Sequence, residues 1–151
     1  MSFNSLKKVS FILSCYNSQN TISKSIESLL NQTYKNIEIL LLDDGSTDNT
    51  YKICSDYERN NSQIVLFRNE VNIGLTKSLN FLYKKASGDF IARQDGDDYS
   101  HKERIEKQLN FIINNNLDGC TTRAQIIGTK KVIPKLSRLL PVGFVLKYKN
   151  P

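Results

Sequence analysis

The apolar residues of this chain fall into short runs separated by polar stretches. Four of the runs, at 9–13, 37–42, 64–67 and 90–92, have the length and composition of β-strands. The run at 37–42 is nearly continuous, which is typical of a parallel strand covered on both faces. These runs therefore predict the buried strands of a parallel sheet.

Between and after these runs, apolar residues recur at the spacing of one helical face. The positions are Ile22, Ile26, Leu29 and Leu30; Ile53, Cys54 and Tyr57; Leu75, Leu79, Leu82 and Tyr83; and Ile105, Leu109, Ile112 and Ile113. Each set predicts an amphipathic helix that packs against the sheet.

Polar residues at the helix ends suggest caps. We expect Asn17, Ser18 or Asn20 to cap the first helix. Gly88 suits the C′ position after the third helix, and the segment 100–103, Ser-His-Lys-Glu, matches a capping box before the fourth.

Strands and helices alternate along the chain, and 121–127 adds a further candidate strand. This order predicts an α/β fold, a Rossmann-like three-layer α/β/α domain around a mostly parallel sheet. In such sheets ligands bind outside the carboxyl ends of the strands. Three polar clusters occupy those ends, at 14–17, 43–47 and 95–98, and the fold should bring them to one edge.

The cluster at 95–98 contains three carboxylates, those of Asp95, Asp97 and Asp98. Their ionised forms repel one another unless a cation is present. Oxygen ligands on a tight acidic turn suit Mg²⁺ or Mn²⁺, which usually bind one or two carboxylates together with substrate phosphates. The alternative is a solvated acidic turn that caps the next helix.

Other polar residues of the clusters suit a nucleotide. Tyr16 could stack on a base, and Asp44 could accept from a base N–H or a ribose hydroxyl, whereas Lys77 could meet a phosphate at a helix N-terminus. The structural alternatives are a loop tyrosine, a capping aspartate and a solvated lysine. Neither G-x-G-x-x-G nor a P-loop occurs. The residues alone thus indicate a nucleotide-diphosphate site with a divalent cation.

Composition excludes several classes of protein. The net charge of +6 favours anionic ligands or a membrane surface, but no nucleic-acid motif accompanies it, so we expect no nucleic-acid partner. Cys15, Cys54 and Cys120 show no spacing of a disulfide framework or a zinc site. His101, the only histidine, excludes a multi-histidine metal site. No span approaches the roughly 20 apolar residues of a membrane helix. We therefore expect a cytoplasmic protein, with peripheral association at the inner face of the membrane left open.

Several motifs occur in the order found in one enzyme family. The chain resembles the N-terminal half of a family 2 glycosyltransferase, which has the GT-A nucleotide-diphospho-sugar transferase fold. The matching stretches are 9–17 (opening strand and P-T-Y-N-like loop), 25–34 (S-I-x-S-[IL]-L-x-Q-T-[YF]), 43–48 (D-D-G-S-T-D), 72–74 with 78–80, 88–91, and 95–98 (D-x-D-D).

The resemblance implies roles for these residues. Ser14, Tyr16 and Asp44 would contact the base and ribose of a nucleotide-diphospho-sugar, with UDP favoured, and Lys77 would lie near the base or phosphates. Asn17 and Gly45 of the same motifs complete the expected nucleotide site. Asp95 and Asp97 would handle the ribose, the diphosphate and its Mn²⁺ or Mg²⁺, supported by Asp98. Residues 14–15 are Ser-Cys where Pro-Thr is usual, and Gly96 replaces a usual Ala or Ser.

The resemblance also implies a metal-dependent, inverting transfer to a glycan or glycoconjugate acceptor. Relatives of this kind run about 100 residues further, so we expect 8–115 to be the donor-binding part and 116–151 the incomplete start of the acceptor part of a single domain. The family's catalytic base is not identified in this sequence, and a partner chain or self-association could complete the fold.

Two other interpretations remain open. The first is a truncated remnant that binds nucleotide and metal without catalysing transfer. The second is a receiver-like signalling module, which is disfavoured because no acidic pair follows the first strand.

Overall fold

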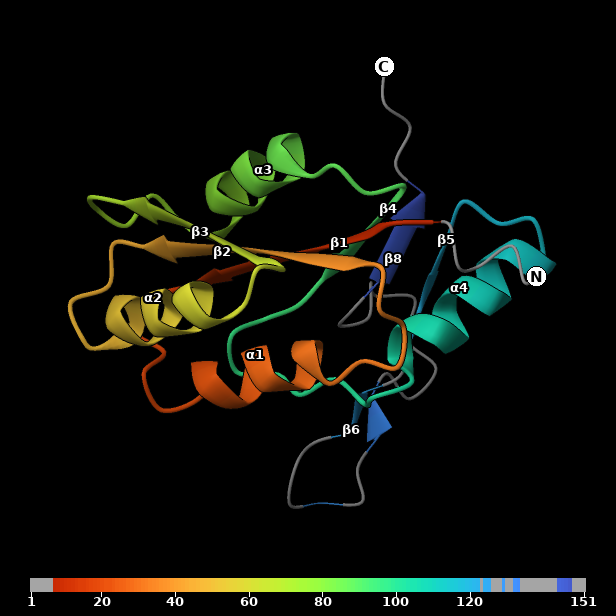
Figure 1. The fold of residues 1–151 in the computed structure, drawn as a ribbon, viewed down its shortest axis with the longest axis horizontal. Coiled ribbons are helices and arrows are strands. Elements are labelled where there is room, and N and C mark those ends of the chain that lie inside the picture. The colour runs from red at the N-terminus through yellow and green to blue at the C-terminus, as the bar shows by residue number, and fades with distance from the viewer. Residues whose placement is uncertain (1–6, 123, 126–128, 130–131, 134–143, 148–151) are drawn as a thin grey trace.

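The computed structural model describes residues 7–122, 124–125, 129, 132–133 and 144–147. Strands and helices alternate over most of this length (Figure 1). In chain order they are β1 (Val9–Cys15), α1 (Ile22–Leu30), β2 (Ile37–Asp44), α2 (Thr50–Asn60), β3 (Ile64–Asn69), α3 (Leu75–Lys85), β4 (Phe90–Arg93), α4 (Arg104–Asn114), β5 (Gly119–Thr121), β6 (Ala124–Gln125), β7 (Val132–Ile133) and β8 (Phe144–Lys147). The expected strands up to residue 92 and the expected helices are confirmed.

The main sheet has the strand order β3-β2-β1-β4-β8-β5. β1 pairs in parallel with both β2 and β4, and β3 pairs in parallel with β2. β8 runs antiparallel to β4 and β5 and joins them. The further strand expected at 121–127 is wrong as one element, because residue 121 belongs to β5 and 124–125 to a separate two-stranded sheet. Residues 126–127 lie outside the described part.

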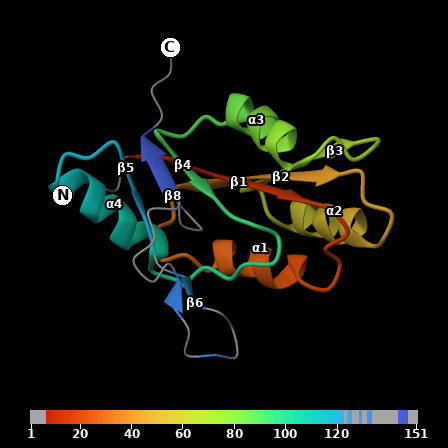
Figure 2. The same cartoon turned by 180° about the vertical axis from the view of Figure 1, so that it is seen from behind.

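Helices cover both faces of the sheet (Figures 1 and 2). One face packs against α1, α2 and α4, so that Phe11 of β1 shares a core with Ile26 and Leu109. The other face packs against α3, where Ile12 shares a smaller core with Leu82. The three-layer prediction is confirmed. No helix of the described part is both long and apolar enough to cross a membrane.

The predicted apolar face of α3 is half wrong. Leu82 is buried and Leu79 packs against the smaller core, but Leu75 and Tyr83 are 48% and 45% exposed. Ser78 is fully buried in their place. The contact between α3 and the sheet is therefore a narrower stripe than the spacing of apolar residues suggested.

Gly88 does not close α3 as a C′ residue. The helix ends at Lys85, and its C-cap, Ala86, has an extended backbone. The Gly88 amide instead donates to Ser10 Oγ at 2.8 Å. A Cβ at Gly88 would lie 2.7 Å from the backbone nitrogen of Ser10, so glycine is required for close approach to β1.

The side-chain caps predicted for α1 and α4 are also wrong. Thr21 and Glu103 occupy the N-cap positions, and neither makes a side-chain cap bond. The N-terminus of α4 is served by a distant residue, Gln32, whose Oε1 accepts from the Ile105 amide at 3.1 Å. Gln32 Nε2 donates to the carbonyl of His101 at 2.9 Å. A tertiary contact thus replaces the local capping box.

Candidate functional site

A cleft of about 460 Å³ opens at the carboxyl ends of β1 and β4. Five of the predicted site residues line it: Ser14, Tyr16, Asn17, Asp95 and Asp97. Leu75, at the start of α3, lines it as well. Two of the three polar clusters therefore meet in one cleft, at the sheet edge where ligands of parallel α/β sheets bind.

The loop after β1 is tied to the loop after β2. Asn17 has a positive φ of 47°, which asparagine tolerates better than most residues. Its Oδ1 accepts from the Thr47 amide at 2.9 Å, and its own amide donates to Ser46 Oγ at 3.0 Å. Tyr16, the preceding residue, is 46% exposed. The loop is therefore braced while a flat aromatic side chain stays accessible at the cleft.

Asp44 is buried beneath the loop 69–74 and does not line the cleft. Its Oδ1 accepts from Asn69 Nδ2 at 2.7 Å, and its Oδ2 accepts from the Gly74 amide at 2.9 Å. Burial opposes ionisation, but these hydrogen bonds and one from the Ile73 amide outweigh it and lower the pKa of Asp44. In this structure Asp44 organises the loop that leads into α3.

Gly45 allows the loop 69–74 to pack closely against the residue that follows β2. Its φ is +73°, and a Cβ there would lie 2.5 Å from the carbonyl carbon of Val71. A side chain would therefore collide with backbone. Gly45, like Asp44, acts on the loop rather than in the cleft.

Asp43 is fully buried at the end of β2. Its carboxylate lies 3.4 Å from Arg68 Nε, and neither of its oxygens has a hydrogen-bond partner in the described part of the chain. The guanidinium of Arg68 stacks 4.1 Å above the ring of Tyr51. The buried charge of Asp43 thus depends on one half-exposed arginine.

The acidic residues after β4 form a tight turn, residues 95–98, in which the Asp98 amide donates to the carbonyl of Asp95 at 3.2 Å. Arg93 binds both carboxylate oxygens of Asp95, at 2.9 and 3.0 Å. Burial, followed by the charges of Asp95 and Asp97, raises the pKa of Asp98, although Arg104 and Arg93 oppose the rise. The carboxylate of Asp95 is thus held by the guanidinium of Arg93, and those of Asp97 and Asp98 are left close together.

The carboxylates of Asp97 and Asp98 make no hydrogen bond or ion pair with any described residue, and Asp97 is exposed. Such oxygens suit Mg²⁺ or Mn²⁺. Across the described residues, however, no group of three or more His, Cys, Asp or Glu side chains is arranged to hold a metal. The chemistry of the donor set fits a divalent cation, but the protein alone offers few ligands, so a cation here would need oxygens from a ligand.

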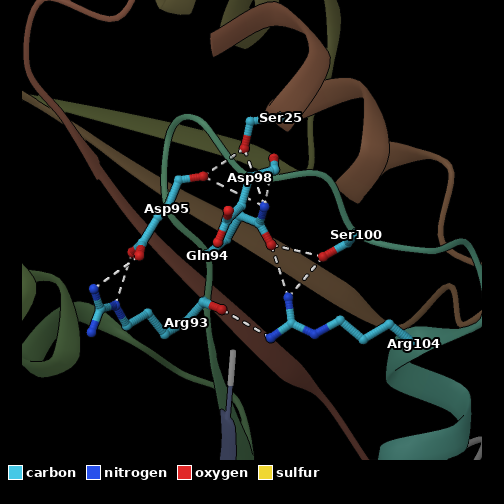
Figure 3. Close-up of polar contacts among 7 residues, drawn as sticks. All are labelled: Ser25, Arg93, Gln94, Asp95, Asp98, Ser100 and Arg104. Atoms are coloured by element: carbon cyan, nitrogen blue, oxygen red, sulfur yellow. Dashed lines mark hydrogen bonds and ion pairs between the residues drawn. The ribbon is translucent and has the colours of Figure 1, made fainter. Parts of the chain in front are cut away.

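Behind the turn lies a buried polar network (Figure 3). Gln94 Oε1 accepts from Ser100 Oγ at 2.7 Å and from Arg104 Nη1 at 2.8 Å. Gln94 Nε2 donates to the carbonyl of Asp98 at 2.9 Å, and Ser25 Oγ donates to the carbonyl of Asp95 at 2.9 Å. Burial lowers the pKa of Arg104 to about 10, so Arg104 is still a cation at neutral pH.

The described geometry combines a half-exposed aromatic side chain and an acidic turn in one cleft of a parallel α/β sheet. A family model, Glycosyl transferase family 2, matches residues 10–150 of the chain. The chain belongs to this family. The putative glycosyltransferase EpsE of Bacillus subtilis is 49% identical over 110 residues, which is 72% of this chain and 40% of EpsE.

A second family 2 relative carries a more specific name. It is the UDP-Glc:α-D-GlcNAc-diphosphoundecaprenol β-1,3-glucosyltransferase WfgD of Escherichia coli, 39% identical over 128 residues. That match covers 84% of this chain and 49% of WfgD. The chain thus spans less than half the length of either of these two relatives.

Solved structures agree with the family 2 assignment. The crystal structure of Staphylococcus aureus TarS 1–349 in complex with UDP has a TM-score of 0.74 and 30% sequence identity, and the match covers 82% of this chain and 38% of that chain. A TarS 1–349 complex with UDP-GlcNAc gives the same TM-score. The expected GT-A fold is confirmed.

Not all the predicted residues of this family 2 chain meet at the cleft. Asp44 and Gly45 lie behind it, as described, and Asp98 is at the far end of the turn. Lys77 is exposed on α3, where it forms no hydrogen bond or ion pair with a described residue, and it does not line the cleft. His101 is exposed and does not line the cleft.

Sequence reasoning missed the residues that hold the turn: Arg93, Gln94, Ser25, Ser100 and Arg104. One signal was available in the family motif on α1. Its polar residues Ser25 and Ser28 lie on the same helical face as buried Ile22 and Leu29, and both are themselves buried. Polar residues on an apolar face require partners, and these were on the segment after β4.

Proposed function

We propose that this chain is the donor-binding part of a glycosyltransferase that transfers a sugar from a nucleotide-diphospho-sugar to a glycan or glycoconjugate. The observation that carries the proposal is the cleft that joins Tyr16 and Asn17 to Asp95 and Asp97. An aromatic side chain suits a nucleobase, and an acidic turn suits a cation on a diphosphate. Membership of family 2 supports the same activity.

The cleft residues have separate tasks in this proposal. Tyr16 stacks on the base, and Ser14 and Asn17 bind the nucleoside from the loop after β1. Asp95, with both oxygens fixed by Arg93, accepts from ribose hydroxyls through its remaining lone pairs. Asp44 acts on the base end of the site through the loop 69–74, which it holds.

Asp97, assisted by Asp98, would hold the Mg²⁺ or Mn²⁺. The cation, when bound, supplies charge neutralisation of the diphosphate, both in the bound donor and as the leaving group. The residues that surround the turn keep its net charge low, because Arg93 and Arg104 offset two of its three carboxylates. This favours binding of the cation together with the diphosphate.

UDP is the favoured nucleotide. TarS, at 30% identity, was crystallised with UDP and with UDP-GlcNAc, and WfgD is named as a UDP-Glc transferase. An acceptor on a polyprenol diphosphate, as in the name of WfgD, would place the reaction at the inner face of the membrane. Lys77, which is exposed on α3, would be free to bind phosphates that approach that helix.

We infer that residues 8–115 bind the donor and that 116–151 begin the acceptor part. An inverting transfer requires a general base that deprotonates the acceptor hydroxyl. No side chain of the described cleft is assigned to that role here. The base would come from a longer form of the chain or from a partner.

The test is calorimetry and thermal unfolding with UDP and Mn²⁺. UDP at about 100 times its Kd should stabilise the folded protein by about 2.7 kcal/mol, a rise in Tm of about 5–10 °C for a domain of this size. Asp97→Asn should remove the part of this rise that depends on Mn²⁺. The matched control is Asp56→Asn, the same change at an aspartate of α2 that is also exposed and that pairs with Arg59.

If neither UDP nor another nucleoside diphosphate shifts the Tm of the folded chain, the donor site is refuted. If UDP binds, release of UDP from UDP-glucose in the presence of acceptor distinguishes a transferase from a binding remnant.

A further inference from the structure

The acidic turn after β4 is anchored through its backbone as well as through the ion pair of Arg93 with Asp95. The carbonyl of Asp95, at its start, accepts from Ser25 Oγ on α1 at 2.9 Å. The carbonyl of Asp98, at its end, accepts from Gln94 Nε2 at 2.9 Å. The carboxylate of Asp95 is held by Arg93, whereas those of Asp97 and Asp98 bind no described residue.

Gln94 has partners at both ends of its amide. Its oxygen accepts from two donors, Ser100 Oγ and Arg104 Nη1, while its nitrogen donates to the carbonyl of Asp98 and lies 3.3 Å from Ser25 Oγ. A flipped amide would place its oxygen against the Asp98 carbonyl and its nitrogen against Arg104. The surroundings therefore allow one orientation of the Gln94 amide. An apolar residue at this buried position after β4 would leave the donors and the acceptor around it without partners.

Arg104 supports Gln94 from the other side. Its Nη2 donates to the carbonyl of Arg93 at 2.9 Å, and its Nε donates to Gln108 Oε1 at 3.1 Å. These contacts tie the last residue of β4 and the side chain of Gln94 to the first turn of α4. Figure 3 shows the resulting chain of bonds from α4 through Gln94 to both ends of the turn.

We propose that Gln94 is a positioning residue that sets the direction in which the acidic turn presents Asp95 to the ribose and Asp97 to the cation on the diphosphate. This inference rests on the proposed donor site. Gln94 does not line the cleft. It holds the carbonyl of Asp98 at 2.9 Å, and it holds that of Asp95 both directly, at 3.5 Å, and through Ser25. A small rotation of this turn would displace every carboxylate on it, because the two anchored carbonyls are only three residues apart.

The substitution that isolates this role is Gln94→Glu. Glutamate keeps an oxygen that can accept from Ser100 and can form an ion pair with Arg104. It replaces the Nε2 donor of Gln94, however, by an oxygen that repels the Asp98 carbonyl. Gln108→Glu is the matched control, since Gln108 also accepts from Arg104 and is buried, yet does not contact the turn.

The first measurement is the Kd of UDP with and without Mn²⁺. We expect Gln94→Glu to reduce the tightening caused by Mn²⁺ about tenfold or more, as loss of one buried hydrogen bond to a metal-binding turn would. UDP affinity without metal should fall by a smaller factor, because Asp95 is displaced from the ribose. Ser25→Ala should reduce the tightening less, and Ser25→Thr, which keeps the hydroxyl, should restore it. An unchanged tightening in Gln94→Glu, or an equal loss with and without metal, overturns the inference.

The second measurement needs no ligand. Amide hydrogen exchange at Asp98 and Ser100 should become faster in Gln94→Glu than in Gln108→Glu, because the turn loses one anchor. Unchanged exchange at both amides overturns the inference whether or not UDP binds. Faster exchange in a chain that binds no UDP retains Gln94 as the residue that holds the turn and refutes the donor site instead.

Discussion

Replacement of Gln32 by leucine should destabilise the protein far more than a glutamine substitution usually does. Gln32 lies two residues after the end of α1 and is fully buried. Its side chain makes three hydrogen bonds, to the Ile105 amide and to the carbonyls of His101 and Ser28. Leucine is similar in size, so the substitution removes the bonds without opening a large cavity.

The magnitude follows from those three bonds. Each contributes about 1 kcal/mol net, and the Ile105 amide would remain buried without a partner. We expect the free energy of unfolding to fall by about 3 kcal/mol, which corresponds to a fall in Tm of about 6–12 °C for a domain of this length.

Urea unfolding followed by circular dichroism measures the effect. The control is Gln63→Leu, the same change at a glutamine whose single bond, to the carbonyl of Lys35, is exposed. It should alter the unfolding free energy by no more than about 0.5 kcal/mol. If Gln32→Leu costs less than about 1 kcal/mol, the interpretation of Gln32 as the tertiary cap of α4 is wrong.

Two further predictions concern the end of β2. Gly45→Ala should destabilise the protein by about 3 kcal/mol, because backbone strain at a positive φ and a collision of the new Cβ with the backbone add. Gly74→Ala, at φ +94° but with nothing within 4 Å of the new Cβ, should cost about 1 kcal/mol. Equal melting temperatures of the two variants would contradict the collision at Gly45. Arg68→Met should lower the free energy of unfolding by about 2 kcal/mol, because the buried carboxylate of Asp43 loses its cation. Addition of Asp43→Asn should recover most of that loss, as measured by chemical denaturation. A double variant less stable than Arg68→Met would show that the charge of Asp43 is not the cause.

The sequence was sufficient for the elements that depend on local pattern. The runs at 9–13 and 37–42 became the interior strands β1 and β2, because a buried parallel strand needs continuous apolar residues. The motifs also located the cleft, since the strand order brings Tyr16 and Asp97 to one edge. Membership of family 2, suggested by the same motifs, is confirmed.

What the sequence could not supply were contacts between distant residues. The segment 100–103 has the letters of a capping box, but the Ser100 hydroxyl bonds to Gln94, and α4 begins at Arg104. Asp44, whose contact with a nucleotide stays a prediction, also holds the loop 69–74 through backbone amides that lie 29 and 30 residues further along the chain. In both cases the bonding partner is remote in sequence, and no periodicity reports such a partner.

The position of β8 in the sheet has a consequence for synthesis of the protein. β1 to β4 can pair as soon as residue 93 has left the ribosome, but among the described strands β5 pairs with the sheet only through β8, residues 144–147. Throughout the intervening translation, β4 is an uncovered edge strand, and such edges template association with other chains. The nascent polypeptide is therefore prone to associate through β4 until β8 has been synthesised, for a time set by the elongation rate. A chaperone that shields β4 during that time would improve the yield of folded protein.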